Sequence, residues 1–333
     1  MAKKKKMLVT GGAGFIGGNF VHYIVEKYSE YDVFNLDDLT YAGDLTKHHA
    51  IDNRQNYHFI KANIVDSDTI LTLFEKEQFD YVVHFAAESH VDRSIANPGT
   101  FVQTNVLGTQ VLLEAARIVG ITKFVHVSTD EVYGELDFDP TTFFTEETPL
   151  KPNSPYSASK AASDLLVQAY HQTYGLTMNI TRCSNNYGPY QFPEKLIPLT
   201  ICKALKDERI PVYGDGQNIR DWLHVFDHCT AIDLILHEGV DGEVYNIGGH
   251  NERTNLQVVK TIIKELGKSE ELIEFVEDRL GHDKRYAINP TKLEQLGWKP
   301  EFTFESGIRQ TIQWNVENVN WLEHVSLKEY TSI

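Results

Sequence analysis

The sequence predicts an α/β fold with a doubly wound parallel sheet and a smaller, interleaved C-terminal domain. Apolar, strand-like runs alternate with helical patterns through the first half of the chain, and this alternation is typical of a parallel sheet covered by helices on both faces. After about residue 190 prolines and glycines separate shorter elements. We expect residues 1–190 to form the sheet domain and residues 191–333 to form mainly the second domain, with some segments returning to the first.

Six short apolar runs are expected to form the parallel strands. The run Phe124-Val125-His126-Val127 is a clear example, and polar residues follow it directly. The predicted strands are residues 7–10, 33–37, 57–64, 81–87, 124–129 and 178–183. Parallel sheets bind ligands at the carboxyl ends of their strands, so the residues that follow these runs are candidates for a functional site.

Four longer segments between the runs carry helical patterns. In residues 105–119 the apolar side chains recur at helical spacing and form one stripe. Ser154 is a favoured capping residue, and Pro155 suits the first position of a helix that continues to Tyr174. The predicted helices are residues 14–28, 68–78, 105–119 and 155–174.

The composition argues against several classes of protein. The chain has 333 residues, 41% of them hydrophobic, so it can bury a sizeable core. Its formal net charge of −16 disfavours nucleic acid as a partner, because a phosphate polymer requires a basic face. No apolar run approaches the length that spans a membrane. Cys183, Cys202 and Cys229 match neither a disulfide framework nor a metal site, so we expect a cytoplasmic protein without a bound metal.

The glycine-rich turn VTGGAGFIGG follows the first predicted strand and opens the first predicted helix. Gly11, Gly12, Gly14 and Gly17 fit the spacing of a dinucleotide-binding loop, in which N–H groups at the helix start hold a pyrophosphate. Asp37 lies about twenty residues after Gly17, where a carboxylate accepts hydrogen bonds from a ribose diol and repels a 2′-phosphate. The sequence therefore predicts a Rossmann-type domain that binds NAD rather than NADP.

Tyr156 and Lys160 lie one turn apart on the predicted helix 155–174, so they share a face. A free tyrosine has a pKa of about 10 and is a poor base at neutral pH. A nearby ammonium group and a cationic nicotinamide would both favour the phenolate. Tyr156 is therefore a candidate proton acceptor for an alcohol that is being oxidised.

Two adjacent acids, Asp130 and Glu131, follow the predicted strand 124–129. Oxidation of an alcohol does not need them, so they indicate a further step. Neighbouring side chains converge on one ligand only where a strand has ended and the chain turns. A hexose oxidised at C4 has an acidic C5 proton, which one carboxylate could remove while a protonated carboxyl donates to the leaving C6 hydroxyl.

These features together resemble the extended short-chain dehydrogenase/reductase family. More narrowly, the chain is similar to the dTDP-glucose 4,6-dehydratases from the first strand to about Trp298, in the segments STDEVYG, HFAAESHVDRSI, TNVLGT, SPYSASKAASD, RCSNNYGPYQFPEKLIPL, GQNIRDWLHVFDH and DRLGHDKRY. The resemblance implies a lyase that acts on dTDP-glucose with an NAD that is regenerated in each cycle. It also implies a homodimer that pairs through the helices 105–119 and 155–174.

The resemblance assigns a role to each of five residues. Thr129 would hydrogen-bond the reacting hydroxyl, Tyr156 would take its proton, and Lys160 would hold the cofactor ribose and lower the pKa of the tyrosine. Asp130 would be the acid at C6 and Glu131 the base at C5.

Further positions carry over from the family as binding contacts. The cofactor positions are Gly11, Gly14, Phe15, Ile16, Gly17, Asp37, Asp38, Leu39, Thr40, Asn63, Ile64, Phe85, Ala86, Ala87, Ser89, Thr104, Tyr156, Lys160 and Asn186. The substrate positions are Ser89, His90, Thr129, Asn185, Lys195, Leu196, Pro211, Tyr213, Arg220, Asn255, Arg279 and His282. Both arginines suit a diphosphate, since guanidinium groups bind phosphate in bidentate fashion.

The chain departs from the family pattern at two positions. Asn63 stands where relatives usually have Asp, and it can hydrogen-bond adenine without a charge. Leu280 stands where relatives usually have Pro, which loosens the turn beside Arg279. Neither departure touches the five catalytic candidates.

Two other functions remain open from the sequence. Another sugar-nucleotide 4-epimerase, decarboxylase or dehydratase could share the glycine loop and the Tyr156–Lys160 pair, although epimerases and decarboxylases do not need Asp130 and Glu131. A non-catalytic NAD-binding sensor could lose Tyr156 or Lys160 without penalty, so their presence at this spacing argues against it.

Overall fold

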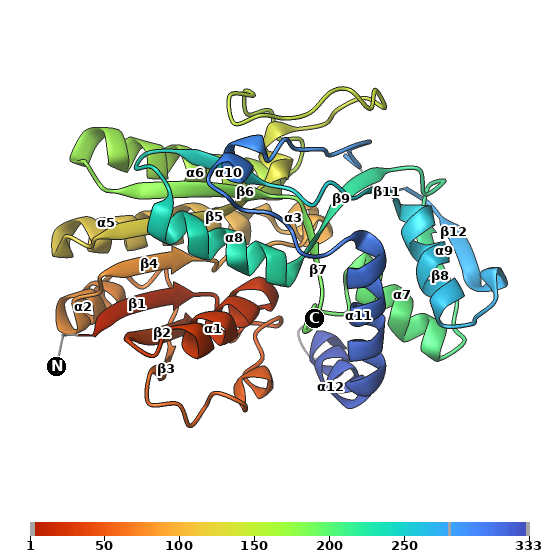
Figure 1. Cartoon of the computed structure of the whole chain (residues 1–333), viewed down its shortest axis with the longest axis horizontal. Helices are drawn as coiled ribbons and strands as arrows, with labels where there is room; N and C mark the ends of the chain where they lie inside the picture. Colours follow the sequence, from red (N-terminus) through yellow and green to blue (C-terminus); the bar gives the residue numbers. More distant parts are fainter. Residues whose placement is uncertain (1–3, 279–280, 331–333) are drawn as a thin grey trace.

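The central feature of the fold is a seven-stranded sheet, seen in a computed structural model that describes residues 4–278 and 281–330 (Figure 1). Its strand order is β10-β6-β5-β4-β1-β2-β3, and every neighbouring pair is parallel. The strands are β1 (Lys5–Thr10), β2 (Tyr31–Asp37), β3 (Tyr57–Lys61), β4 (Tyr81–His84), β5 (Lys123–Thr129), β6 (Met178–Cys183) and β10 (Val244–Ile247). The order reverses between β1 and β4, which is the point where such sheets bind ligands.

Helices cover both faces of this sheet because successive strand residues point to opposite sides. Met7 and Val9 pack into one core with α1 and α8, whereas Leu8 packs into the other with α2, α5 and α6. The covering helices are α1 (Phe15–Lys27), α2 (Ser67–Glu77), α5 (Thr109–Val119), α6 (Pro155–Tyr174) and α8 (Val225–Glu238). The predicted fold class is confirmed.

Shorter helical segments lie at the carboxyl end of the sheet. A 3-10 turn, η3, follows β5 directly and carries both acids. A π-helical run, η2, connects α4 to α5 and makes one continuous helical stretch with them. These segments are η1 (Thr46–His48), α3 (Val91–Ala96), α4 (Pro98–Phe101), η2 (Val102–Gly108) and η3 (Asp130–Tyr133).

The C-terminal part of the chain builds a second cluster of elements beside the sheet (Figure 1). Its strands form a three-stranded sheet, β11-β9-β7, and a two-stranded pair, β12-β8. The strands are β7 (Asn185–Tyr187), β8 (Ile210–Tyr213), β9 (Ile219–His224), β11 (Glu252–Thr254) and β12 (Ile273–Val276). The helices are α7 (Leu196–Leu205), α9 (Asn255–Glu265), η4 (Glu270–Leu272), α10 (Thr291–Gln295), α11 (Phe304–Glu317) and α12 (Val319–Tyr330).

Two segments after residue 190, one strand and one helix, pack with the large sheet. Strand β10 pairs with β6, and α8 covers one face of the sheet with α1. In the described residues, 4–278 and 281–330, no helix is long and apolar enough to cross a membrane.

Candidate active site

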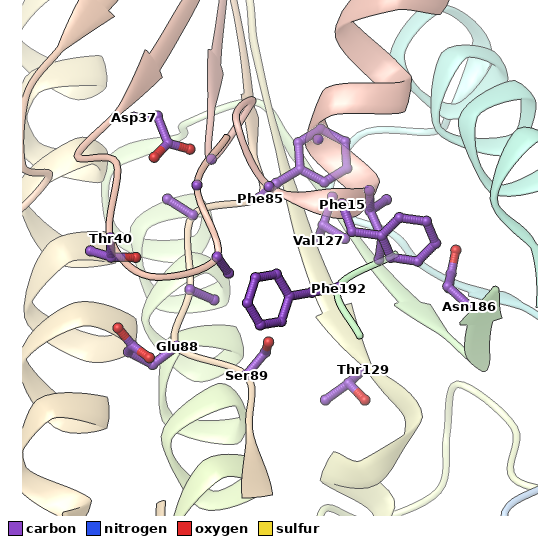
Figure 2. A pocket seen from close by; sticks show the side chains of 18 of the residues that line it. Phe15, Asp37, Thr40, Phe85, Glu88, Ser89, Val127, Thr129, Asn186 and Phe192 are labelled. Carbon is purple, nitrogen blue, oxygen red and sulfur yellow. The ribbon is translucent and has the colours of Figure 1, made fainter. Parts of the chain in front are cut away.

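A cavity of about 350 Å³ opens at the carboxyl ends of β1, β2, β4, β5 and β6 (Figure 2). In Figure 2, Asp37 and Thr40 lie on one side of the cavity, Thr129 lies on the other, and Phe192 projects between them. Of the predicted cofactor positions, all except Leu39 line the cavity. Leu39 itself has a left-handed backbone with φ 57°, and its N–H donates to Asp37 Oδ1 at 2.8 Å.

The glycine loop between β1 and α1 has the geometry of a phosphate cradle. Gly11 has φ +73°, and a Cβ there would lie 2.6 Å from the backbone nitrogen of Ala86. Gly14 is the N-cap of α1, and neither a capping side chain nor an acidic residue occupies the first turn. The first N–H groups of α1 are therefore available to an anion, so the loop fits the pyrophosphate of a dinucleotide.

Asp37 ends β2 beside this loop, as the sequence predicted. Its Oδ2 accepts a hydrogen bond from Ala13 N at 3.0 Å, which ties it to the glycine loop. Burial raises the pKa of Asp37, and the backbone N–H bonds from Leu39 and Ala13 oppose that rise. Each carboxylate oxygen has a further lone pair, so this group fits a ribose diol.

Asn63 lines the same part of the cavity, but its amide is already engaged. Its Nδ2 donates to Asp38 Oδ2 at 2.9 Å, and its Oδ1 accepts from Val65 N at 3.0 Å. An aspartate at this position would place two carboxylates together, so Asn63 suits its neighbour Asp38.

The five catalytic candidates, Thr129, Asp130, Glu131, Tyr156 and Lys160, all line the cavity. Thr129 ends β5 and caps η3: its Oγ1 accepts from Glu131 N at 3.3 Å and donates to Asp130 Oδ1 at 3.4 Å. The chain turns immediately after the strand, which is why two consecutive acids reach one cavity.

The surroundings of Asp130 favour the protonated form of its carboxyl group. Asp130 is 2% exposed, and its Oδ2 has no hydrogen-bond partner among the described residues. Burial raises its pKa well above the ordinary value, and the nearby Glu131 and Asp221 raise it further, against the charge of Arg220. A neutral carboxyl group at this place can donate a proton.

Tyr156 and Lys160 face the cavity from the first turns of α6. The helix starts with a capping box between Ser154 and Ser157 and with Pro155 in its first turn. Lys160 Nζ donates to Val127 O at 2.8 Å, which fixes the ammonium group under the carboxyl end of β5.

The protein by itself holds the phenol of Tyr156 neutral. Burial raises its pKa well above 10, and the negative charge of Glu131 adds to this. Burial also lowers the pKa of Lys160 to about 8. A hydrogen bond with Thr129 opposes this rise, and a cationic nicotinamide beside the ring would oppose it further, so the predicted role of Tyr156 as a base depends on the bound cofactor.

The predicted substrate positions divide into two groups. Ser89, Thr129, Asn185 and Lys195 line the cavity, and Lys195 Nζ donates to Ser89 O at 3.3 Å. His90, Leu196, Pro211, Tyr213, Arg220, Asn255 and His282 do not line it, and Arg279 lies outside the described residues.

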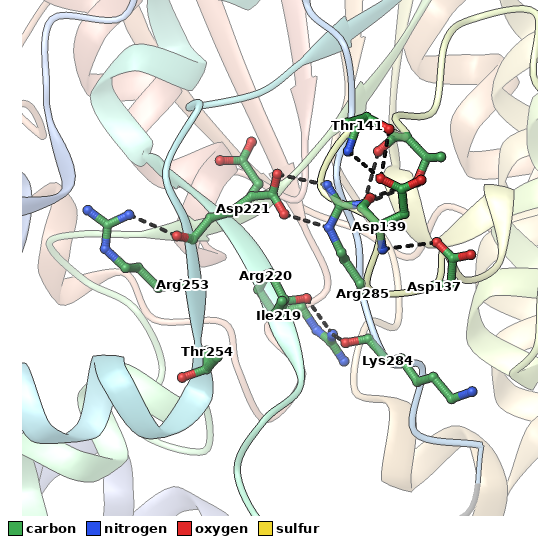
Figure 3. A network of polar contacts seen from close by, with 12 residues as sticks. Asp137, Asp139, Thr141, Ile219, Arg220, Asp221, Arg253, Thr254, Lys284 and Arg285 are labelled. Atoms are coloured by element: carbon green, nitrogen blue, oxygen red, sulfur yellow. Dashed lines mark hydrogen bonds and ion pairs between the residues drawn. The ribbon is translucent and has the colours of Figure 1, made fainter.

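The guanidinium group of Arg220 binds backbone carbonyl groups of the protein in this structure. Arg220 is 4% exposed, and its guanidinium donates to Ile219 O at 2.7 Å (Figure 3). It also donates to Asp283 O at 2.9 Å. It also stacks over the ring of Tyr286 at 4.3 Å. Tyr213 contacts His282 at a ring distance of 6.3 Å in the same C-terminal cluster. The roles of these residues toward a substrate stay predictions.

The cavity also has lining residues that were not predicted from the sequence to be binding or catalytic positions. Lys47 Nζ donates to Gly14 O at 2.8 Å inside the glycine loop, and Trp321 Nε1 donates to Asp44 Oδ2 at 2.8 Å. The other such lining residues include Cys183, Ser184, Tyr190, Gln191, Phe192 and Glu194. All six belong to the quoted segment RCSNNYGPYQFPEKLIPL, which was a usable signal, whereas no local pattern points to Lys47 or Trp321.

The chain is similar to known proteins in both sequence and fold. The sequence model described as GDP-mannose 4,6 dehydratase matches residues 8–311. The dTDP-glucose 4,6-dehydratase of Xanthomonas campestris pv. campestris (strain B100) is 53% identical over 337 residues, which covers 96% of this chain and 95% of that protein.

Two solved structures are similar in fold as well as in sequence. DesIV, the dTDP-glucose 4,6-dehydratase of Streptomyces venezuelae with NAD bound, has a TM-score of 0.93 and 46% identity and covers 96% of this chain and 99% of its own. The dTDP-glucose 4,6-dehydratase of Bacillus anthracis str. Ames in complex with NAD has a TM-score of 0.90 and 51% identity, with the same coverage of 96% and 99%. Each match extends over nearly the whole length of both proteins.

Proposed function

Because the chain belongs to the dTDP-glucose 4,6-dehydratase family, we propose that it converts dTDP-glucose to dTDP-4-dehydro-6-deoxy-glucose and water. The cofactor is NAD, for which the glycine loop, the free helix start and Asp37 are suited. When bound, NAD supplies the chemistry of accepting a hydride from C4 and returning it to C6. The observation that carries the proposal is the adjacent pair of acids Asp130 and Glu131 on η3, at the cavity that also holds Tyr156 and Lys160.

The protein's own groups would carry out four proton transfers. Tyr156 takes the proton of the C4 hydroxyl, while Thr129 orients that hydroxyl and Lys160 stabilises the phenolate. Glu131 removes the C5 proton, and Asp130 protonates the C6 hydroxyl, which leaves as water. Glu131 then returns its proton to C5. At the end of the cycle Tyr156 has gained one proton and Asp130 has lost one. A proton transfer from Tyr156 to Asp130 therefore restores both groups.

The test is to incubate the purified protein with dTDP-glucose, add no NAD, and weigh the product by mass spectrometry. Loss of one water, with no NAD supplied, supports the dehydratase and a cofactor that stays bound. An unchanged mass with a changed C4 configuration in sugar NMR would support an epimerase instead. Unaltered dTDP-glucose, even after NAD is supplied and UDP- and GDP-sugars are tried, would favour a non-catalytic sensor.

A homodimer is part of the proposal, and exposed apolar side chains support it. They lie on α3, η2, α5 and α6 and are Ile95, Val102, Leu107, Ile118, Leu165 and Tyr174, which are 41 to 57% exposed. Exposed apolar side chains on helix faces suit contact with a second copy of the chain. Leu165→Glu is expected to give a monomer in light scattering, whereas Phe275→Glu, equally exposed at 57% on β12, is expected to leave the dimer intact.

The remaining parts of the proposal concern the cellular compartment and the ligands that each part of the chain binds. Cys183, Cys202 and Cys229 are free thiols, which suits a reducing cytoplasm. Residues 1–190 would hold the cofactor and residues 191–333 would hold mainly the nucleotide sugar. Limited proteolysis with and without dTDP-glucose would test that division, because ligand should protect the second part most.

A further inference from the structure

The short turn that carries the two acids is anchored by a buried tyrosine. Tyr133 is the last residue of η3 and is 2% exposed. Its hydroxyl donates to Asn246 Oδ1 at 2.8 Å and accepts from Arg182 Nη1 at 3.0 Å. One phenolic oxygen therefore connects the acid-bearing turn to β10 and β6.

The anchor continues to the helix that carries Tyr156 and Lys160. Arg182 is 2% exposed on β6, and its Nε donates to Asp164 Oδ2 at 2.9 Å. Asp164 lies on α6 one turn after Lys160 and is completely buried. His126 Nε2 on β5 lies 3.4 Å from Asp164 Oδ1. Buried charges with this many partners hold one arrangement, because any other arrangement leaves a charge unpaired.

We propose that Tyr133, Arg182 and Asp164 form a positioning bridge, which sets the acids on η3 relative to the Tyr156–Lys160 face of α6. The inference rests on the proposed function, in which one sugar must react with both groups in turn. C4 reacts beside Tyr156, whereas C5 and C6 react beside Glu131 and Asp130. The two groups come from different elements, and the bridge is a buried polar connection between those elements.

The bridge predicts which step of the reaction slows when it is broken. Loss of the Tyr133 hydroxyl frees η3 but leaves α6, Tyr156 and Lys160 in place. The elimination of water should then slow by ~10- to 100-fold, since small displacements of a catalytic group have effects of this size. Oxidation at C4 should change much less, so the reduced cofactor should accumulate during a single turnover.

The experiment compares Tyr133→Phe with wild type and with Tyr187→Phe. Tyr187 is also fully buried, and its hydroxyl has no hydrogen-bond partner among the described residues, so its variant controls for the loss of a buried hydroxyl alone. Stopped-flow absorbance of the reduced nicotinamide and mass spectrometry of the sugar separate oxidation from elimination. Amide hydrogen exchange of residues 130–134 reports the anchoring of η3 without any need for activity.

The expected result is faster exchange in residues 130–134 and accumulation of the reduced cofactor in Tyr133→Phe only. Unchanged exchange would overturn the bridge, whatever the activity. Faster exchange with an unchanged ratio of the oxidation and elimination rates would overturn its positioning role. A wild type that never releases water from dTDP-glucose would refute the proposed function, and the exchange measurement would still decide whether the bridge anchors the turn.

Discussion

Gly11 and Gly120 form a matched pair of positions for alanine substitution. They separate the cost in stability of a left-handed backbone from the cost of a steric clash. Their φ angles are nearly equal, +73° and +74°. A Cβ at Gly120 would meet nothing within 4 Å, whereas a Cβ at Gly11 would lie 2.6 Å from the nitrogen and 2.7 Å from the Cα of Ala86. Both are backbone atoms of the segment that follows β4, so no side chain can simply rotate away.

The expected magnitudes follow from this geometry. An alanine in the left-handed region costs about 1–2 kcal/mol, and this is the whole cost expected for Gly120→Ala. Gly11→Ala has the same cost plus about 1–3 kcal/mol for backbone atoms that must move apart. The free energy of unfolding should therefore fall by about 1–3 kcal/mol more in Gly11→Ala than in Gly120→Ala.

Urea unfolding of both variants measures this difference, with the slope compared to confirm that only stability has changed. The amount of NAD that remains bound after purification gives a second measurement. It should fall in Gly11→Ala, whose loop lines the cavity, and stay at the wild-type level in Gly120→Ala. Equal losses of stability in the two variants would refute the reasoning, because the close approach at Gly11 would then have no effect.

Three further predictions concern the site and its supports. Trp321→Phe removes the indole hydrogen bond to Asp44, which is worth about 1.4 kcal/mol, and should increase the loss of NAD on dialysis by ~10-fold. Trp314 does not line the cavity, so Trp314→Phe should retain NAD. Equal loss of NAD from both variants would contradict this prediction. Asp130→Asn keeps the shape but cannot donate a carboxyl proton, so water loss should slow by at least ~100-fold in mass-spectrometric assays, and an unchanged rate would remove Asp130 from the mechanism. Asp164→Asn should cost about 3–5 kcal/mol in urea unfolding because Arg182 loses its buried partner. Burial alone would raise the pKa of Asp164, but His126 and Arg182 hold it below the ordinary value, so its stabilisation is present above pH ~3.9 and is lost as the pH falls through the lower, folded-state pKa; a wild-type advantage that persists in strong acid would contradict this.

The sequence predicted the sheet well because each strand is an apolar run with buried neighbours. It extended two strands too far, to residue 64 where β3 ends at Lys61 and to residue 87 where β4 ends at His84. Apolar residues continue past both strands because they turn into the cavity, as Ile64 and Phe85 do. Periodicity cannot separate a residue that faces a cavity from one that continues a strand.

The helix predicted at 105–119 shows a different limit. Its first turns belong to the π-helical run η2, which starts at Val102. Asn105 bonds to both backbone groups of Glu88, with Oδ1 accepting from Glu88 N at 2.8 Å and Nδ2 donating to Glu88 O at 2.9 Å. A tertiary contact of this kind does not change the apolar pattern, so the sequence predicts an ordinary helix.

The candidate site was predictable where its residues lie in short motifs and unpredictable where distant segments meet. The acids and the Tyr156–Lys160 pair lie within such motifs. Trp321 reaches the cavity through a contact with Asp44, 277 residues away in the chain. Arg220 was expected at a diphosphate, but its local bonds to Ile219 and Asp283 depend on a chain path that one sequence does not reveal.

The position of β10 has a consequence for the synthesis of the protein. This strand, Val244–Ile247, completes the large sheet by pairing with β6, which leaves the ribosome more than sixty residues earlier. Until β10 emerges, the outer edge of β6 is an open template for pairing with another chain. The apolar face of the sheet that α8 covers also stays exposed until residues 225–238 have been synthesised. A nascent chain that stops near residue 190 is therefore prone to aggregate, and the first part of this protein matures only when most of the second part has been made.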